Sequence, residues 1–237
     1  MAGFFDLLVW GDAGWGDDLL RGVLVTVEIS IGAFATGLLI GGLTALVKLR
    51  GPRWAVALAS LYTTICRAVP EILLIILLFF AGQTALNAVL SAVGIGDVGI
   101  SGFAAATVVL GLVQGAYASE ILRGAILAVP TGQIEAARAY GLHGAMLFRR
   151  VTLPAIVPFA LPGLANLWMV IIKDSTLISV VGYNELLFTT KQAAGSTKYY
   201  MSFYALVGAL YYCLTLSSNV GIRALENRVR RWMPRMA

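Results

Sequence analysis

The stretch Glu135-Ala-Ala-Arg-Ala-Tyr-Gly141, followed by Arg149-Arg-Val-Thr-Leu-Pro154, organises this chain. It is rich in charged, small and turn-forming residues, and it separates two long apolar runs. Its alanines favour a short helix after Pro130, and Gly141 can adopt the left-handed conformation that ends a helix. We expect a structured loop that presents a short helix to an aqueous compartment. A solvated linker without a specific role is the alternative.

The composition indicates a membrane protein. Of the 237 residues, 59% are hydrophobic and only 12% are charged, whereas a soluble domain carries about twice that share of charge. The basic residues lie between the apolar runs rather than among aromatic residues on a soluble face, which argues against nucleic acid as a partner. Cys66 and Cys213 lie inside apolar runs, so we expect neither a disulfide framework nor a metal site.

The apolar runs predict an all-α, polytopic membrane protein with five transmembrane helices. The expected spans cover residues 22–47, 54–81, 102–118, 156–172 and 203–221. Three parts follow from this division. Residues 1–21 contain tryptophans and four aspartates and suit the membrane interface, residues 22–223 form the transmembrane domain, and residues 224–237 form a basic tail.

The second expected span contains an ionisable pair beside a proline. An arginine in mid-bilayer costs about 2.5–3.5 kcal/mol on insertion scales, so Arg67 should face protein or water. Arg67 and Glu71 can share one helix face, but Pro70 between them favours a kink or a break. Two interpretations stay open: an internal ion pair that stabilises the bundle, or a broken helix that lines a translocation path.

Other polar segments predict shorter elements. Residues 82–101 could contain a short interfacial helix, and residues 189–200 read as an exposed loop. Lys173-Asp-Ser-Thr176 directly precedes an apolar run, which suggests a re-entrant turn or a gate. Glu120 and Arg123 are three residues apart and can pair on one helix face.

The basic residues also predict the orientation. With five spans, residues 48–53, 123–154 and 222–237 lie on the same side and hold twelve basic residues, against four on the other side. The positive-inside rule therefore places the Glu135 loop and the C-terminus in the cytoplasm and the N-terminus outside. The sequence has no Gly-rich phosphate loop, no Ser-His-Asp set and no metal cluster, so we expect no catalytic residue and no metal ligand.

The spacing of the opening stretch resembles the EAA loop of the membrane subunits of binding-protein-dependent ABC importers. That loop has Glu-Ala-Ala, three residues, Gly, nine residues, an aliphatic residue, any residue, and Leu-Pro. This chain fills every position, with Val151 where the family usually has Ile. Blocks around residues 62–71, 115–133 and 161–177 resemble the polar amino acid branch, closest to the Q-type subunit of histidine, basic amino acid and opine importers. The first block departs from the branch at Ala68.

The resemblance implies the permease fold of a type I ABC importer that moves polar amino acids, such as histidine, arginine or lysine, or opines, across the inner membrane. It implies a heterodimer with a second permease subunit of M type, two ATP-binding subunits and a periplasmic solute-binding protein. The N-terminus would then be periplasmic. No cofactor is expected in this chain, because ATP and Mg²⁺ would be bound by the ATPase subunits.

The resemblance also implies a coupling helix at residues 133–141, inside a cytoplasmic loop of residues 124–154, that docks in a groove of the ATPase. The residues expected to couple are Gln133, Glu135, Ala136, Ala137, Arg138, Gly141, Leu153 and Pro154. An amino acid needs acceptors for its ammonium group and donors for its carboxylate. The candidates for its path are Arg67, Glu71, Asn166, Asp174, Ser175 and Thr176.

Two other classes of function remain as alternatives. A secondary transporter or channel would work without ATP, but five spans without an evident inverted repeat argue against it. A structural membrane subunit of a larger assembly would tolerate mutation of the charged residues inside the spans.

Overall fold

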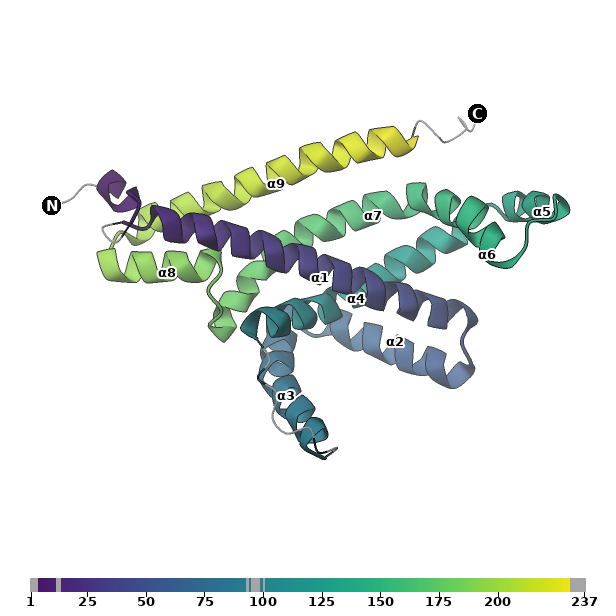
Figure 1. Ribbon diagram of the computed structural model, residues 1–237, viewed down its shortest axis with the longest axis horizontal. Coiled ribbons are helices and arrows are strands. Elements are labelled where there is room, and N and C mark those ends of the chain that lie inside the picture. The colour runs from purple at the N-terminus through teal and green to yellow at the C-terminus, as the bar shows by residue number, and fades with distance from the viewer. Residues whose placement is uncertain (1–3, 12–13, 93, 95–98, 100, 231–237) are drawn as a thin grey trace.

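The computed structural model describes all residues except 1–3, 12–13, 93, 95–98, 100 and 231–237 (Figure 1). The described residues form helices and no strand. The elements are η1 (Phe4–Leu8), α1 (Gly16–Arg50), α2 (Arg53–Ala68), α3 (Glu71–Ala92), α4 (Gly102–Leu127), α5 (Thr131–Ala139), α6 (Gly144–Leu147), η2 (Phe148–Thr152), α7 (Leu153–Asp174), η3 (Ser175–Val181), α8 (Leu186–Thr197) and α9 (Tyr200–Arg230).

Five long apolar segments can cross a membrane by length and composition: α1, α3, α4, α9 and the segment Gly144–Val181 that contains α7. The predicted all-α fold with five spans is therefore confirmed. Several helices exceed the predicted spans, since α1 begins at Gly16 and α9 continues to Arg230. Helices α5 and α6 lie at one end of the bundle, and η1 and α8 lie at the other (Figure 1).

Helices α1 and α4 pack closely along a seam of small residues. A Cβ atom added to Gly41 would lie 2.6 Å from the Cβ of Ala118 and 2.9 Å from the carbonyl oxygen of Gly115. Larger side chains would hold the two backbones apart, so the glycine allows the approach. This packing makes α4 the most buried of the five spanning segments, and its neighbours are arranged around it.

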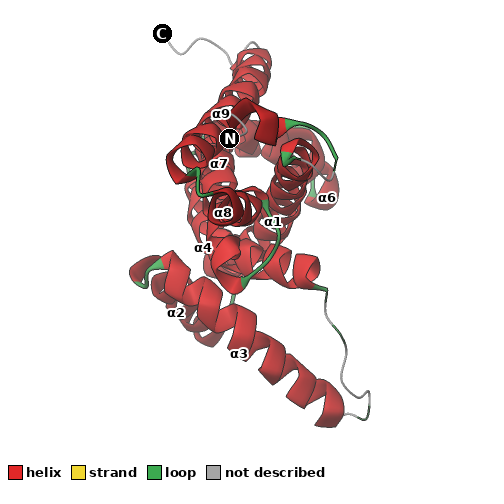
Figure 2. Ribbon diagram, turned by 90° about the vertical axis from the view of Figure 1, so that its left-hand side faces the viewer, coloured by secondary structure: helices red, strands yellow, loops and turns green. Residues whose placement is uncertain are grey.

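The predicted second span over residues 54–81 is wrong. Helix α2 ends at Ala68 and α3 begins at Glu71, with Val69 in an extended conformation between them. The residue before a proline is driven out of the helical region, so Pro70 produces a complete break. Only α3 is long and apolar enough to span. Helix α2 lies against α1 and α4, and α3 projects away from the other helices (Figure 2).

Two further sequence predictions are corrected. Residues 82–92 continue α3 instead of forming an interfacial helix, and six of residues 93–101 lie outside the described part of the chain. The expected exposed loop at 189–200 is mostly α8, in which Thr189, Thr190, Ala193 and Ala194 are buried. The polar composition of residues 189–200 suggested a loop, but the small residues of α8 pack against α1 and α9, and the sequence does not show this contact.

The segment after Asp174 forms the predicted turn. The 3-10 helix η3 has Ser175, Ile178 and Ser179 buried, and Gly182 reverses the chain with a φ of 83°. Helix η3 packs against α3, α7 and α8. A gating role for this turn stays a prediction.

Candidate functional site

The short helix α5 forms as the sequence predicts. It follows Pro130 and ends at Ala139, and Gly141 just after it has a φ of 83°. Gly141 N donates to the carbonyl of Arg138 at 2.9 Å, and Leu142 N donates to the carbonyl of Ala137 at 3.1 Å. This pair of bonds is the Schellman pattern, which satisfies the last carbonyl groups of a helix.

One face of α5 is held by the bundle and the other is free. Ala137 is buried, and Ile134 packs against a cluster of buried residues from α4 and α7. The residues of the expected coupling set that are exposed on α5 and the turn after it are Gln133, Glu135, Ala136, Arg138 and Gly141. Helix α5 follows α4 after a short connection, and it is joined to α7 through α6 and η2, both of which it contacts (Figure 1).

The chain re-enters the membrane through an irregular turn that the sequence did not predict. Residues 148–152 form a π-helix, and α7 starts with Leu153 and Pro154, both exposed. Pro154 has no N–H group, so the carbonyl four residues before it cannot receive its usual helical bond, and a wider turn becomes favourable. The proline was the signal that could have revealed this turn.

An acidic pair lies at the centre of the candidate substrate path. Glu71 is the first residue of α3 and Asp174 is the last residue of α7, and the two carboxyl groups are neighbours in space. Nε2 of Gln114 donates to Oδ2 of Asp174 at 2.7 Å. Tyr117, one turn further along α4, interacts with Glu71. We call Glu71, Asp174 and Gln114 the acid site.

Sequence reasoning missed Gln114 and Tyr117. Gln114 is fully buried, and its Oε1 atom has no hydrogen-bond partner among the described residues. Leaving a buried acceptor without a partner costs about 1–3 kcal/mol, and because this atom is enclosed, a ligand can bond to it only when the surrounding helices separate. The available signal was a glutamine inside an otherwise apolar run of α4.

Three other predicted path residues, Ser175, Thr176 and Asn166, do not form part of the acid site. The hydroxyl of Ser175 donates to the carbonyl of Ile172 at 2.7 Å, and that of Thr176 donates to Lys173 at 2.6 Å, so both are bound to their own backbone. Asn166 is exposed on α7, about two turns before Asp174.

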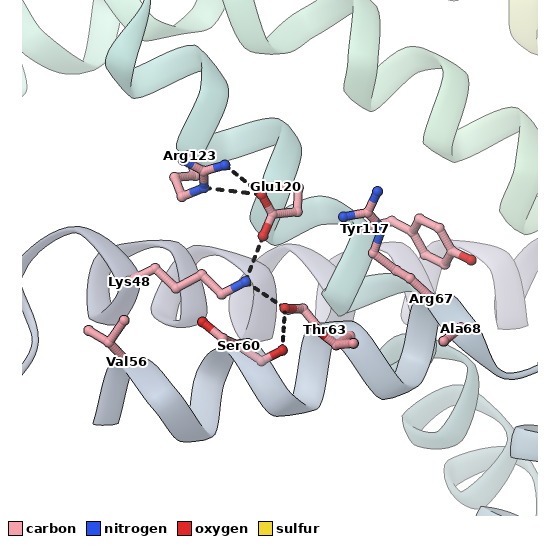
Figure 3. A pocket seen from close by; sticks show the side chains of 10 residues that line it. Lys48, Val56, Ser60, Thr63, Arg67, Ala68, Tyr117, Glu120 and Arg123 are labelled. Atoms are coloured by element: carbon pink, nitrogen blue, oxygen red, sulfur yellow. Dashed lines mark hydrogen bonds and ion pairs between the residues drawn. The ribbon is translucent and has the colours of Figure 1, made fainter. Parts of the chain in front are cut away.

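Arg67 is exposed at the end of α2. Among the described residues it forms no salt bridge, so the ion pair with Glu71 considered above is not present. The break at Pro70 explains this, since spacing by four residues brings side chains together only within a continuous helix. Arg67 lies beside Tyr117 instead (Figure 3).

A second polar cluster joins three helices. Oε1 of Glu120 on α4 accepts a bond of 2.6 Å from Nζ of Lys48 on α1, and Arg123 binds its Oε2 at 2.8 Å. The predicted pair of Glu120 and Arg123 is therefore confirmed. The participation of Lys48, which also donates to Thr63 of α2, follows from the tertiary packing alone.

Comparisons with known proteins agree with the fold and the motif. The family described as "Binding-protein-dependent transport system inner membrane component" matches residues 37–231. The chain is 40% identical over 233 residues to the octopine transport system permease protein of Rhizobium radiobacter, with 98% of each chain covered. It is 38% identical over 215 residues to the histidine/lysine/arginine/ornithine transport system permease protein of Escherichia coli strain K12, covering 91% of this chain and 94% of that protein.

A solved structure is also similar. A chain in the crystal structure of an amino acid ABC transporter with histidines superposes with a TM-score of 0.74 at 28% identity, covering 90% of this chain and 95% of that chain. The expected fold of an ABC importer permease is thereby confirmed. These matches favour the importer interpretation over an ATP-independent transporter and over a purely structural subunit.

Proposed function

Because the chain belongs to the family of binding-protein-dependent transport system inner membrane components and is a permease subunit of an ABC importer, we propose that its substrate is a basic amino acid or an opine. The octopine permease and the histidine/lysine/arginine/ornithine permease are both similar along more than nine-tenths of this chain. The substrates in their names share a cationic group on an amino acid skeleton. The acid site suits that group.

The acid site is the observation that carries this proposal. Two carboxyl groups within reach of each other repel when both are ionised, and a cation between them removes the repulsion. The free Oε1 of Gln114 offers a further acceptor. Ammonium and guanidinium groups present only donors, so they match this set of acceptors. Of the six path candidates, the geometry favours Glu71 and Asp174, while Asn166, Ser175 and Thr176 are secondary.

Coupling to ATP would pass through α5. We infer that its exposed face docks in a groove of an ATPase subunit, where Glu135 meets a donor and Ala136 allows close approach. Gln133, Ala137, Arg138, Gly141, Leu153 and Pro154 support this surface. Two ATPase subunits would bind ATP and Mg²⁺, and this chain itself would catalyse no reaction. ATP binding must favour one membrane conformation over the other for coupling to occur, and a rigid α5 transmits that preference to α4 and α7.

The remaining partners and the orientation belong to the same proposal. The end of the bundle that carries α5 also carries the basic ends of α1, α2 and α9 (Figure 1), which supports a cytoplasmic position for this end and for the tail at 224–237. Residues 1–21 would then be periplasmic, on the side that receives the solute-binding protein. Helices α3 and α9 leave most of their surface uncovered, which supports a second permease subunit of M type.

Reconstitution of the complete complex in proteoliposomes tests the proposal. ATP-dependent uptake is measured for arginine, lysine, ornithine, histidine and octopine, with neutral amino acids as comparison. Glu71→Gln and Asp174→Asn should lower the uptake of cationic substrates, while Glu226→Gln near the end of α9 should leave it unchanged. Wild-type uptake and affinity in both acid-site variants would contradict the assignment of the acid site.

A further inference from the structure

A pocket of about 750 Å³ opens between the C-terminal end of α1, α2 and α4 (Figure 3). Its lining extends along α2 from Val56 to Ala68, the last residue of that helix. We call it the basic pocket, because Lys48, Arg67 and Arg123 line it and Glu120 is its one acidic lining residue among those the structure describes.

The basic pocket has an excess of positive charge. Glu120 is shared by two cations, with Lys48 Nζ at 2.6 Å, and Arg123 Nη2 at 2.8 Å and Nε at 3.1 Å. The carboxylate of Glu120 compensates one of these two positive charges, and Arg67 contributes a third. The lining residues therefore retain a net charge of two positive charges. Such an excess of positive charge on a concave surface favours the binding of an anion.

The basic side chains of the pocket differ in how firmly hydrogen bonds and ion pairs hold them in place. The side chain of Lys48 is only 9% exposed and is fixed by bonds to Glu120 and Thr63. Arg67 is exposed and forms no salt bridge among the described residues. Its guanidinium group keeps a planar fork of donors, which binds a carboxylate through two parallel hydrogen bonds. Arg67 is therefore the residue of this pocket that can accept a ligand.

The basic pocket adjoins the acid site. Tyr117 lines the pocket and is a neighbour of Glu71 in the acid site, so the two regions lie close together. Arg67 and Glu71 lie on opposite sides of the break at Pro70. The path thus presents hydrogen-bond acceptors at the acid site and hydrogen-bond donors in the adjoining basic pocket. An amino acid with a cationic side chain has the complementary polarity.

We propose that the basic pocket is the carboxylate site of the substrate path. Arg67 binds the carboxylate while the cationic group occupies the acid site, and Lys48 and Arg123 keep the pocket positive. The proposal rests on the proposed transport of basic amino acids or opines. Two excess charges favour substrates with a free α-carboxylate, and favour those with a second carboxylate more strongly.

The test compares two ligands that differ only in the carboxylate: arginine and agmatine, its decarboxylated form. Their binding to the complete membrane complex is measured in nanodiscs of neutral lipid, without the solute-binding protein. Wild-type complex should prefer arginine, and Arg67→Gln should reduce this preference by about tenfold or more, as expected for the loss of the paired, charge-assisted hydrogen bonds of the guanidinium group. Arg67→Lys should keep part of the preference. The matched control is Arg53→Gln, at the first residue of the same helix and outside the pocket.

The outcomes separate this inference from the proposed function. If the wild-type complex shows no ATP-dependent uptake of any amino acid or opine, the proposed function fails. If uptake is present but the ratio of the arginine and agmatine affinities is the same in Arg67→Gln and in wild type, the carboxylate site alone is overturned. Equal weakening of both ligands would also overturn it, because the carboxylate would then be irrelevant.

A phospholipid phosphate is the other source of an anion for this pocket. Nanodiscs that contain anionic phospholipid test it, with retained lipid measured by mass spectrometry after purification of the complex. Retention of anionic lipid that is lost in Arg67→Gln, without any change in the preference for arginine, would make the pocket a lipid site and contradict the proposal. Equal lipid retention in both proteins, with the tenfold change in preference, would support it.

Discussion

Gln114 on α4 and Asp174 at the end of α7 are sixty residues apart in sequence, and Nε2 of the first donates to Oδ2 of the second at 2.7 Å. Gln114 is fully buried, and its Oε1 stays without a partner among the described residues. The bond holds Asp174 close to Glu71 at the start of α3. Three spanning helices therefore meet at one group of acceptors.

Gln114→Leu should weaken the binding of cationic substrates by about tenfold, since it removes an acceptor for a charged donor. It also removes the donor that holds Asp174. The measurement is equilibrium binding of labelled arginine to the purified complex. Gln83→Leu on α3 is the matched control and should bind normally. Unchanged affinity in Gln114→Leu would show that its amide oxygen does not contact the substrate.

Gly41→Ala should lower the thermal stability of the complex, because its new Cβ atom would lie 2.6 Å from that of Ala118. Overpacking of this kind costs about 1–3 kcal/mol. The neighbouring Gly42 provides the control, since a Cβ atom there would have Leu122 at 3.9 Å as its nearest neighbour. Gly42→Ala should be neutral or slightly stabilising. Equal melting temperatures for the two variants would argue against the tight seam between α1 and α4.

Gly141→Val should uncouple transport from ATP. A β-branched residue at a φ of 83° is strained by about 1–3 kcal/mol, so the end of α5 should distort. The expected result is a loss of substrate-stimulated ATPase activity while the protein still inserts in the membrane. Gly132→Ala in the first turn of α5, where no atom lies within 4 Å of a new Cβ, should behave as wild type. Full ATPase stimulation in Gly141→Val would contradict a role for this turn in coupling.

Glu185 should make the stability of the protein dependent on pH. Glu185 is fully buried just before α8, and this burial raises the pKa of its carboxyl group. Hydrogen bonds to the carboxylate oppose the rise; they come from the backbone N–H groups of Leu187 and Phe188 and from the side chains of Tyr211 and Thr26. A raised pKa means that the folded protein binds the proton more tightly than the unfolded chain. The contribution to stability is therefore complete below the ordinary value of 4.5 and is lost as the pH rises through the folded pKa.

The measurement is the melting temperature of the complex as a function of pH. Glu185→Gln should flatten the decline that wild type shows as the pH rises from about 4.5, the ordinary carboxyl pKa. Glu226→Gln, at the opposite end of α9, should retain the wild-type slope. Identical slopes in all three proteins would show that Glu185 does not titrate differently in the folded state.

Several features were predictable because their causes are local. The left-handed turn at Gly141 and the helix before it depend on neighbouring residues, and the break at Pro70 depends on the geometry of one proline. The assignment of the second span was wrong because apolar composition continues across that break. Helix α8 was missed because Thr189 and Thr190 become buried only through contact with distant helices.

The amino-acid order alone was sufficient for the helical class, the number of spans and the short helix before Gly141, because length, hydropathy and turn chemistry act over a few residues. Tertiary packing decided the rest. It brought Gln114 to Asp174 and Lys48 to Glu120, and it left Arg67 without an ion pair in the part of the chain that the structure describes. A polar side chain acquires its role from whichever groups lie beside it in space, and these groups come from helices far away in the sequence.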